Sequence, residues 1–184
     1  VVLLDEAAQA SITNLAPDAA PAPMQPVQPG DLMRLMYTSG TTDRPKGVML
    51  TYENLYWKSA DQTVALGLNA ETRLLVVGPL YHVGALDLPG ISVLWHGGML
   101  SVHRNFEPEQ ALQSIDKEKL NAAWFAPVMT TAILTCPTRN TYDVSSLQWA
   151  IGGGEKTPEV RIRAFSELFK NARYIDAYGL TETV

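Results

Sequence analysis

One segment of the sequence crowds hydroxyl side chains and a lysine into a short stretch. It reads Tyr37-Thr38-Ser39-Gly40-Thr41-Thr42-Asp43-Arg44-Pro45-Lys46-Gly47-Val48. Hydroxyls and backbone N–H groups on a loop can surround phosphate oxygens, and a lysine adds a point charge to them. The order differs from a Walker A loop, because Lys46 comes before its glycine and no Ser or Thr follows it directly. The segment therefore indicates phosphate binding, with a surface turn and a solvated lysine as the alternative.

A second segment, near the end of the chain, combines an aromatic ring, a glycine and a Thr-Glu pair. It reads Asp176-Ala177-Tyr178-Gly179-Leu180-Thr181-Glu182-Thr183. Tyr178 offers a flat face to a purine ring, and Gly179 allows the backbone a close approach. Thr181 can donate to a phosphate, and Glu182 is a hard oxygen ligand of the kind that suits Mg²⁺. Taken alone, such a pair after a strand is also a common helix start.

Two smaller features complete the set of residues that could do chemistry. The run Gly152-Gly153-Gly154-Glu155 allows a flat ligand to approach the backbone, although a tight turn would need the same glycines. His82 lies in the apolar stretch Pro79-Leu80-Tyr81-His82-Val83-Gly84, where a histidine can also be a satisfied core residue. His96 and His103 match no motif, and we expect structural roles for them. No His/Cys spacing indicates zinc, and no serine lies in a nucleophile elbow.

In combination these segments resemble the signature motifs of the adenylate-forming superfamily. That superfamily contains acyl-CoA synthetases, luciferases and the adenylation domains of peptide synthetases. The stretch 37–48 resembles its phosphate-binding signature, and 176–183 follows in the family's order. The resemblance runs from about Asp31 to Val184. It implies that a substrate carboxylate attacks the α-phosphorus of Mg-ATP, that acyl-adenylate and pyrophosphate result, and that a thiol, usually of coenzyme A, then displaces AMP.

The resemblance also implies roles for individual residues. Lys46, Thr181 and Glu182 would be the catalytic groups, and Glu182 would hold Mg²⁺. His82 and Gly153 would border the acyl group. The residues implied in nucleotide binding are Thr38, Ser39, Gly40, Thr41, Thr42, Lys46, Gly153, Gly154, Glu155, Asp176, Tyr178, Gly179 and Thr181.

The sequence departs from the family's pattern at one position of the phosphate loop. It also contains only part of the segments that the family's enzymes have. Asp43 stands where that loop commonly has glycine, and a carboxylate there would repel a triphosphate by about 1 kcal/mol at 4 Å in water. The family's ribose-binding aspartate and its C-terminal domain with a catalytic lysine would lie beyond Val184. We therefore expect 1–30 to be the end of a preceding section with a Pro/Ala-rich linker. We expect 31–184 to be a partial AMP-binding (adenylation) domain, inactive without the absent C-terminal domain.

Short apolar runs alternate with helical patterns along most of the chain. The runs that predict strands are 32–38, 74–77, 99–102, 122–126, 147–151 and 174–177. Thr51 is the expected N-cap of one helix, and three prolines, at 108, 127 and 158, are expected to open others. Alternating strands and helices predict an α/β fold with a mainly parallel sheet flanked by helices. Ligands of such sheets bind beyond the carboxyl ends of the strands.

The apolar faces of two of these helices follow from residues at helical spacing. For the helix after Thr51 the expected core face is Tyr52, Leu55, Tyr56, Ala60 and Val64. For the helix after Pro158 it is Val160, Ala164, Phe165 and Leu168.

Composition argues against some classes of binding partner and indicates the cellular compartment. The net charge is -5 and no long basic run occurs, which argues against a nucleic-acid partner. The single cysteine, Cys136, excludes an internal disulfide and suits a reducing compartment, so we expect a cytoplasmic protein. Residues 74–100 are apolar except for Asp87, but their glycines and prolines predict several short elements instead of a transmembrane span.

The leading functional hypothesis is an acyl-CoA synthetase for a fatty or other apolar acid that uses ATP, Mg²⁺ and coenzyme A. One alternative is an adenylation domain that loads a carrier protein, which a following phosphopantetheine-attachment domain would favour. The other is a non-catalytic nucleotide-binding module, which the absence of any nucleotide effect on stability would favour. A partial domain would also leave apolar surface uncovered, which predicts self-association.

Overall fold

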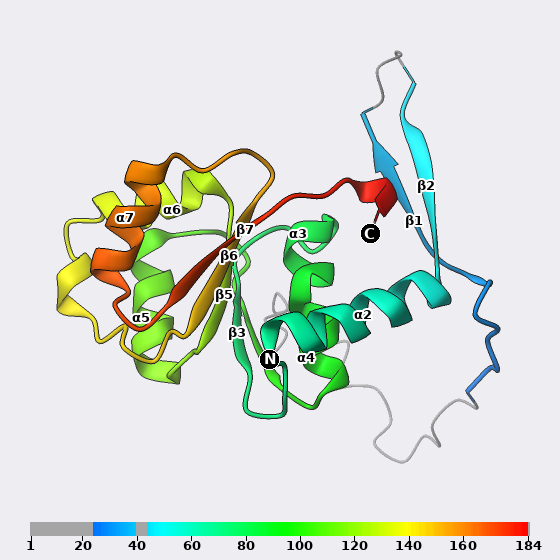
Figure 1. Ribbon diagram of the computed structural model, residues 1–184, viewed down its shortest axis with the longest axis horizontal. Coiled ribbons are helices and arrows are strands. Elements are labelled where there is room, and N and C mark those ends of the chain that lie inside the picture. The colour runs from blue at the N-terminus through cyan, green and yellow to red at the C-terminus, as the bar shows by residue number, and fades with distance from the viewer. Residues whose placement is uncertain (1–23, 40–43, 184) are drawn as a thin grey trace, which may run out of the picture.

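The protein consists of a parallel sheet between two layers of helices and of a separate hairpin (Figure 1), in a computed structural model that describes residues 24–39 and 44–183. The strands are β1 (Leu32–Thr38), β2 (Lys46–Thr51), β3 (Arg73–Val76), β4 (Met99–Val102), β5 (Ala122–Phe125), β6 (Trp149–Gly153) and β7 (Arg173–Ala177). The helices are α2 (Tyr52–Leu66), α3 (Val83–Ala85), α4 (Ile91–Trp95), α5 (Pro108–Glu118), α6 (Pro127–Thr135) and α7 (Glu159–Leu168). Shorter helical turns are η1 (Leu86–Gly90), η2 (Arg139–Thr141) and η3 (Thr181–Thr183).

The sheet contains β4, β3, β5, β6 and β7 in that order, and every neighbouring pair is parallel. Its central strands β5 and β6 are buried along their whole length, because helices cover both faces. The predicted α/β class with a mainly parallel sheet is confirmed. Five of the predicted strands lie in this sheet, one with the predicted bounds and the others with bounds shifted by one or two residues.

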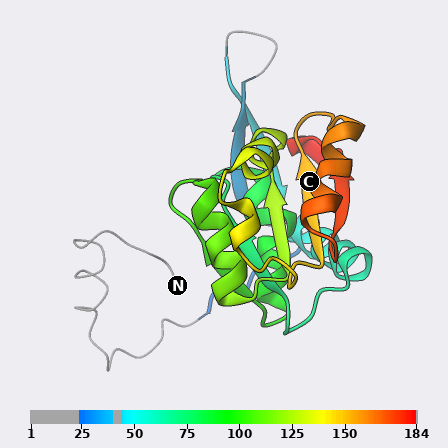
Figure 2. The same cartoon turned by 90° about the vertical axis from the view of Figure 1, so that its left-hand side faces the viewer.

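Helices α5, α6 and α7 cover one face of the sheet and form the front layer in Figure 2, while α2 and α4 cover the other. The connection from β3 to β4 passes through α4, and the later connections pass through α5, α6 and α7. After β3 the chain therefore continues into the helices on one face of the sheet, and after the neighbouring strand β5 it continues into the helices on the other face. Such a switch point leaves a crevice outside the carboxyl ends of the two strands, where open α/β sheets bind ligands.

The hairpin is a difference from the sequence prediction. The strand at 32–38 is present, but it pairs antiparallel with β2, for which no strand was predicted. Lys46, interpreted as a loop residue, is the first residue of β2 and lies opposite Thr38. A run of six residues that starts with Lys-Gly carries too little periodicity to be recognised as a strand.

The predicted helix starts are largely confirmed. The Thr51 hydroxyl accepts the Asn54 backbone N–H at 3.3 Å, while the Asn54 side chain accepts the Thr51 N–H at 3.0 Å, which is a reciprocal cap. Prolines 108 and 127 are the first residues of α5 and α6. Pro158 is the residue before α7.

The expected apolar face of α2 is wrong. Ser59 and Gln62 are the buried residues of this helix, whereas Tyr56 is 53% and Val64 is 87% exposed. In α7, Phe165 is buried as predicted, but Val160 is exposed. The reason in α2 is a buried polar network, described below, which a pattern of apolar residues cannot reveal.

Residues 74–100 divide into β3, α3, η1, α4 and β4, as their glycines and prolines predicted. Within the described parts of the chain, every helix is too short or too polar to cross a bilayer.

Candidate functional site

The carboxyl edge of the sheet brings two of the predicted segments together. Strands β6 and β7 are neighbours, with Gly152 opposite Asp176 and Gly153 opposite Ala177. The glycine-rich loop after β6 and the Tyr178 loop after β7 therefore leave the sheet side by side. A Cβ atom at Gly153 would lie 3.0 Å from the Ala177 carbonyl oxygen, so close backbone packing requires glycine there.

The glycine-rich loop is anchored by a hydrogen bond between two hydroxyl groups. The sequence analysis did not identify these residues. Thr157, buried at the end of this loop, lies with its hydroxyl 2.9 Å from the hydroxyl of Tyr174 on β7. The Tyr174 ring is held edge-on against Phe165, with the ring centroids 5.1 Å apart. Gly154 has a φ of +94°, is exposed and has no atom within 4 Å of the place a Cβ would take, so its backbone is accessible to a ligand.

The loop after β7 presents its side chains to solvent. Tyr178 is 94% exposed, which leaves both faces of its ring free for stacking. Thr181 and Glu182 lie in η3, which is closed by the Leu180 N–H donating to the Thr183 hydroxyl at 3.1 Å. Glu182 is exposed as well, and η3 contacts β2 of the hairpin.

The hairpin carries the described part of the predicted phosphate loop. Thr38 and Lys46 face each other at the end of the paired strands, and Ser39 follows with an exposed side chain. Through the contact between β2 and η3, the hairpin approaches the segment of Thr181 and Glu182 (Figure 1). The predicted ligands Gly40, Thr41 and Thr42, together with the departure at position 43, lie outside the described residues.

His82 lies after β3, at the switch point of the sheet. Its Nδ1 accepts the Gly84 backbone N–H at 3.0 Å, which leaves Nε2 as the nitrogen that can donate to a ligand. The other two histidines have structural partners, as expected. His96 bonds to the Thr63 hydroxyl at 2.7 Å, and His103 bonds to the Ser114 hydroxyl at 3.0 Å.

Trp124 is a further residue of this region that the sequence analysis did not single out. It lies on β5, next to β3, and its ring occupies the space that a side chain at Gly84 would need. Trp124 is only 7% exposed, and its Nε1 has no hydrogen-bond partner among the described residues. A buried indole N–H normally finds an acceptor, and a bound molecule would reach this one only after a shift of the residues that cover it.

The donor set at this edge fits Mg²⁺ bound together with a nucleotide. No group of three or more His, Cys, Asp or Glu side chains that could hold a metal occurs in the described ranges. Mg²⁺ commonly takes one or two protein carboxylates and completes its shell with phosphates and water. The exposed carboxylate of Glu182 meets that requirement.

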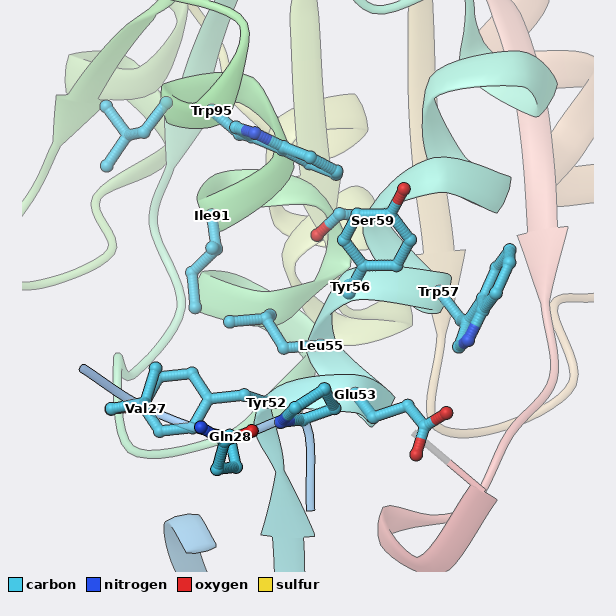
Figure 3. A pocket seen from close by; sticks show the side chains of 12 residues that line it. Val27, Gln28, Tyr52, Glu53, Leu55, Tyr56, Trp57, Ser59, Ile91 and Trp95 are labelled. Atoms are coloured by element: carbon cyan, nitrogen blue, oxygen red, sulfur yellow. The ribbon is translucent and has the colours of Figure 1, made fainter. Parts of the chain in front are cut away.

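Two hollows of the described structure lie elsewhere. One is a groove of about 840 Å³ beside α2 and α4, lined by Tyr52, Tyr56, Trp57 and Trp95 (Figure 3). A smaller polar cavity of about 350 Å³, which includes Arg173, lies at the opposite, amino-terminal edge of the sheet. Neither hollow is lined by a predicted site residue, so the candidate site is the carboxyl edge of the sheet and not either of these hollows.

Comparison with known proteins places these features in a family. The whole chain, residues 1–184, matches the family described as AMP-binding enzyme. A feruloyl-CoA synthase of Amycolatopsis sp. is 35% identical over 160 residues, which cover 87% of this chain and 32% of that protein. The 4-coumarate–CoA ligase CCL1 of Humulus lupulus is 31% identical over 169 residues, which cover 90% of this chain and 31% of that protein.

A solved structure agrees with these relatives. The inhibitor-bound N-terminal domain of FACL13 from Mycobacterium tuberculosis matches with a TM-score of 0.77 and 27% identity. The match covers 87% of this chain and 39% of that domain. This chain spans about a third of the length of the curated relatives it matches.

Proposed function

This chain belongs to the AMP-binding enzyme family, and we propose that it forms the nucleotide- and acyl-binding part of an ATP-dependent acid–CoA ligase. In the proposed reaction a carboxylate attacks the α-phosphorus of ATP, and acyl-adenylate and pyrophosphate are formed. The thiol of coenzyme A then attacks the acyl carbon and displaces AMP. The observation that supports this proposal most is the adjacency of the β6 and β7 loops, with η3 in contact with the hairpin.

The proposed nucleotide site lies at the ends of β6 and β7. The exposed ring of Tyr178 stacks on adenine, and the backbone of Gly153 and Gly154 lies along the nucleotide, bordered by Glu155 and Asp176. The free approach to Gly154 and the exposure of Tyr178 support this arrangement.

The phosphates are held between η3 and the hairpin in this proposal. Thr181 donates to the α-phosphate, and Glu182 holds Mg²⁺, which neutralises charge on the triphosphate. Thr38, Ser39 and Lys46 bind the β- and γ-phosphates. The carboxylate of the acid is already a competent nucleophile, so these residues act by positioning and by charge neutralisation.

The acid is proposed to bind at the switch point between β3 and β5. His82 donates from Nε2 toward the reacting carboxylate, and Gly153 borders the same group. Within the expected class of apolar acids, the proposed substrate is a planar aromatic acid and not a fatty chain. The relatives named above are ligases of the aromatic feruloyl and 4-coumaroyl groups, which supports the same choice.

Pyrophosphate exchange by the whole protein tests this function. Labelled pyrophosphate should enter ATP when an aromatic carboxylic acid is present, and straight-chain fatty acids of similar volume should support less exchange. A second assay then offers the adenylate either coenzyme A or a phosphopantetheinylated carrier protein, and we expect thioester formation with coenzyme A. Absence of exchange with every acid, in a protein shown to bind ATP, would favour the non-catalytic nucleotide-binding module.

A further inference from the structure

The hairpin of β1 and β2 is attached to the rest of the described structure at few points. Among the described residues its two strands pair only with each other, and Figure 1 shows them standing beside the sheet with their far end free of other elements. At the base, the Glu53 N–H donates to the Pro29 carbonyl at 2.8 Å. Met36 and Leu50 are its buried side chains, whereas Tyr37 and Met49 are exposed. Few apolar contacts therefore fix the orientation of this element.

A buried cluster of charges joins the hairpin to the segment that follows His82. Arg34, in the middle of β1, donates from Nη2 to Oδ2 of Asp87 in η1. Lys58 of α2 places its Nζ 3.9 Å from the same oxygen. Asp87 is 1% exposed, and the Lys58 side chain is 8% exposed. One carboxylate thus connects β1, α2 and η1.

Hydrogen bonds extend this cluster into α4. The Gln62 side chain donates to the Asp87 backbone carbonyl at 3.2 Å. Ser92 of α4 donates to the Gln62 side chain at 2.7 Å and lies 3.1 Å from the Ser59 hydroxyl. The buried residues of α2 are these polar ones, so this helix packs on α4 and η1 through the network and not through an apolar stripe.

The energetics of buried charges indicate what such a cluster contributes. Desolvation of the ions offsets most of their attraction, so a buried ion pair adds little net stability compared with well-packed apolar residues. Its geometry is nevertheless specific, because a guanidinium and a carboxylate must meet in a defined orientation. The pair of Arg34 and Asp87 therefore ties the middle of β1 to η1.

We propose that Arg34, Asp87 and Lys58 are positioning residues that fix the hairpin, and with it Thr38 and Lys46, relative to His82 and the sheet. This inference rests on the proposed function in one respect, since it takes the hairpin as the phosphate-binding element. In this role the cluster fixes the position of the groups that bind the β- and γ-phosphates relative to the groups that bind AMP and the acid.

Calorimetric titrations of this chain with Mg·ATP and with AMP test the positioning role. AMP lacks the β- and γ-phosphates, so its affinity does not depend on the hairpin. Asp87→Asn should weaken ATP binding by about tenfold or more while AMP binding changes by less than about twofold. The matched control is Glu159→Gln, which breaks the exposed Arg163–Glu159 pair on α7 and should leave both affinities unchanged.

The triple variant Arg34→Met/Lys58→Met/Asp87→Leu guards against a loss of folding, because it removes all three charges of the cluster together. It should fold and show the same ATP-specific loss. Equal weakening of ATP and AMP, or no change in either, would overturn the proposal. Absence of binding of both nucleotides to the unaltered chain would refute the proposed function instead.

A distance measurement decides the positioning role without any nucleotide. Spin labels at Met49→Cys on β2 and Val128→Cys on α6, both exposed positions, report the hairpin orientation when the buried thiol is removed by Cys136→Ser. Asp87→Asn should shift or broaden the distance distribution, and Glu159→Gln should not. An unchanged distribution in Asp87→Asn would contradict the proposal.

Discussion

The Tyr174 hydroxyl on β7 lies 2.9 Å from the Thr157 hydroxyl and fills the space that any side chain at Gly152 would need. The tyrosine therefore serves two purposes at the edge of the sheet. It fills the space beside Gly152 of β6, and it anchors the end of the loop that follows that strand. The backbone of Gly153 and Gly154 is held between these two points.

Gly152→Ala should destabilise the chain by about 1–3 kcal/mol, because the added methyl displaces the Tyr174 ring and breaks its bond to Thr157. Tyr174→Val makes room for the methyl, so the double variant should lose less than the sum of the two single losses. Urea unfolding measures all three. Gly30→Ala, where a Cβ meets nothing within 4 Å, is the control and should be close to neutral. Additive losses would mean that the two positions are not coupled.

The buried amine of Lys58 should make stability depend on pH. Burial lowers the pKa of Lys58 to about 8, with Asp87 opposing the shift and Arg34 adding to it. In the unfolded chain this lysine keeps its proton up to its ordinary pKa near 10.5. The unfolded state therefore binds more protons between pH 8 and 10.5, so the contribution of Lys58 to the free energy of unfolding rises with pH across that window.

The comparison with Lys58→Met isolates this effect from other titrating groups. Between pH 7.5 and 10 the stability of the unaltered chain should rise relative to the variant, by up to about 3 kcal/mol. Guanidinium unfolding at a series of pH values measures the difference. A constant difference across the window would show that Lys58 is not held in a desolvated site.

Glu182→Ala should impair pyrophosphate exchange by the whole protein more than Lys46→Ala. Glu182 is proposed to fix the metal, which acts on the charge of the entire triphosphate, and its loss should cost about 10²–10³ in rate. Lys46 begins an exposed strand and neutralises only the departing pyrophosphate, so we expect about a tenfold loss. The reverse order would contradict these roles.

Trp124→Phe tests the unpartnered indole N–H in acid recognition. The ring is kept and the donor is lost, so aromatic acids with an oxygen substituent on the ring should bind about two- to tenfold less well. Unsubstituted aromatic acids should keep their KM, and kcat should change little for either. An equal rise in KM for both groups of acids would mean that Trp124 acts by shape alone.

Local signals in the sequence sufficed for most of the fold. Prolines 108 and 127 and the capping residue Thr51 act within one turn, so their positions identify helix starts directly. The apolar runs of the central strands are equally plain, because both of their faces are buried. Strand β2 was missed because its identity depends on pairing with β1 and not on its own pattern.

The parts of the site that lie in one continuous sequence motif could be predicted. The interactions between residues that are distant in sequence could not. The strings around Lys46 and Glu182 could be recognised as they stand. Thr157 with Tyr174, and Arg34 with Asp87, join positions that only folding brings together. One signal for the charge cluster was present, since Asp87 is the single charge in an apolar stretch and a buried carboxylate needs a partner.

Calorimetric titration of this chain with ATP, with and without Mg²⁺, tests the central claim most directly. The account predicts that the folded chain binds ATP in the presence of Mg²⁺. It also predicts that omission of the metal, or Glu182→Ala, weakens binding by about tenfold or more. AMP affinity should be insensitive to both changes. No detectable heat at millimolar ATP and Mg²⁺, from a sample shown to be folded, would contradict a nucleotide site at the carboxyl edge of β6 and β7.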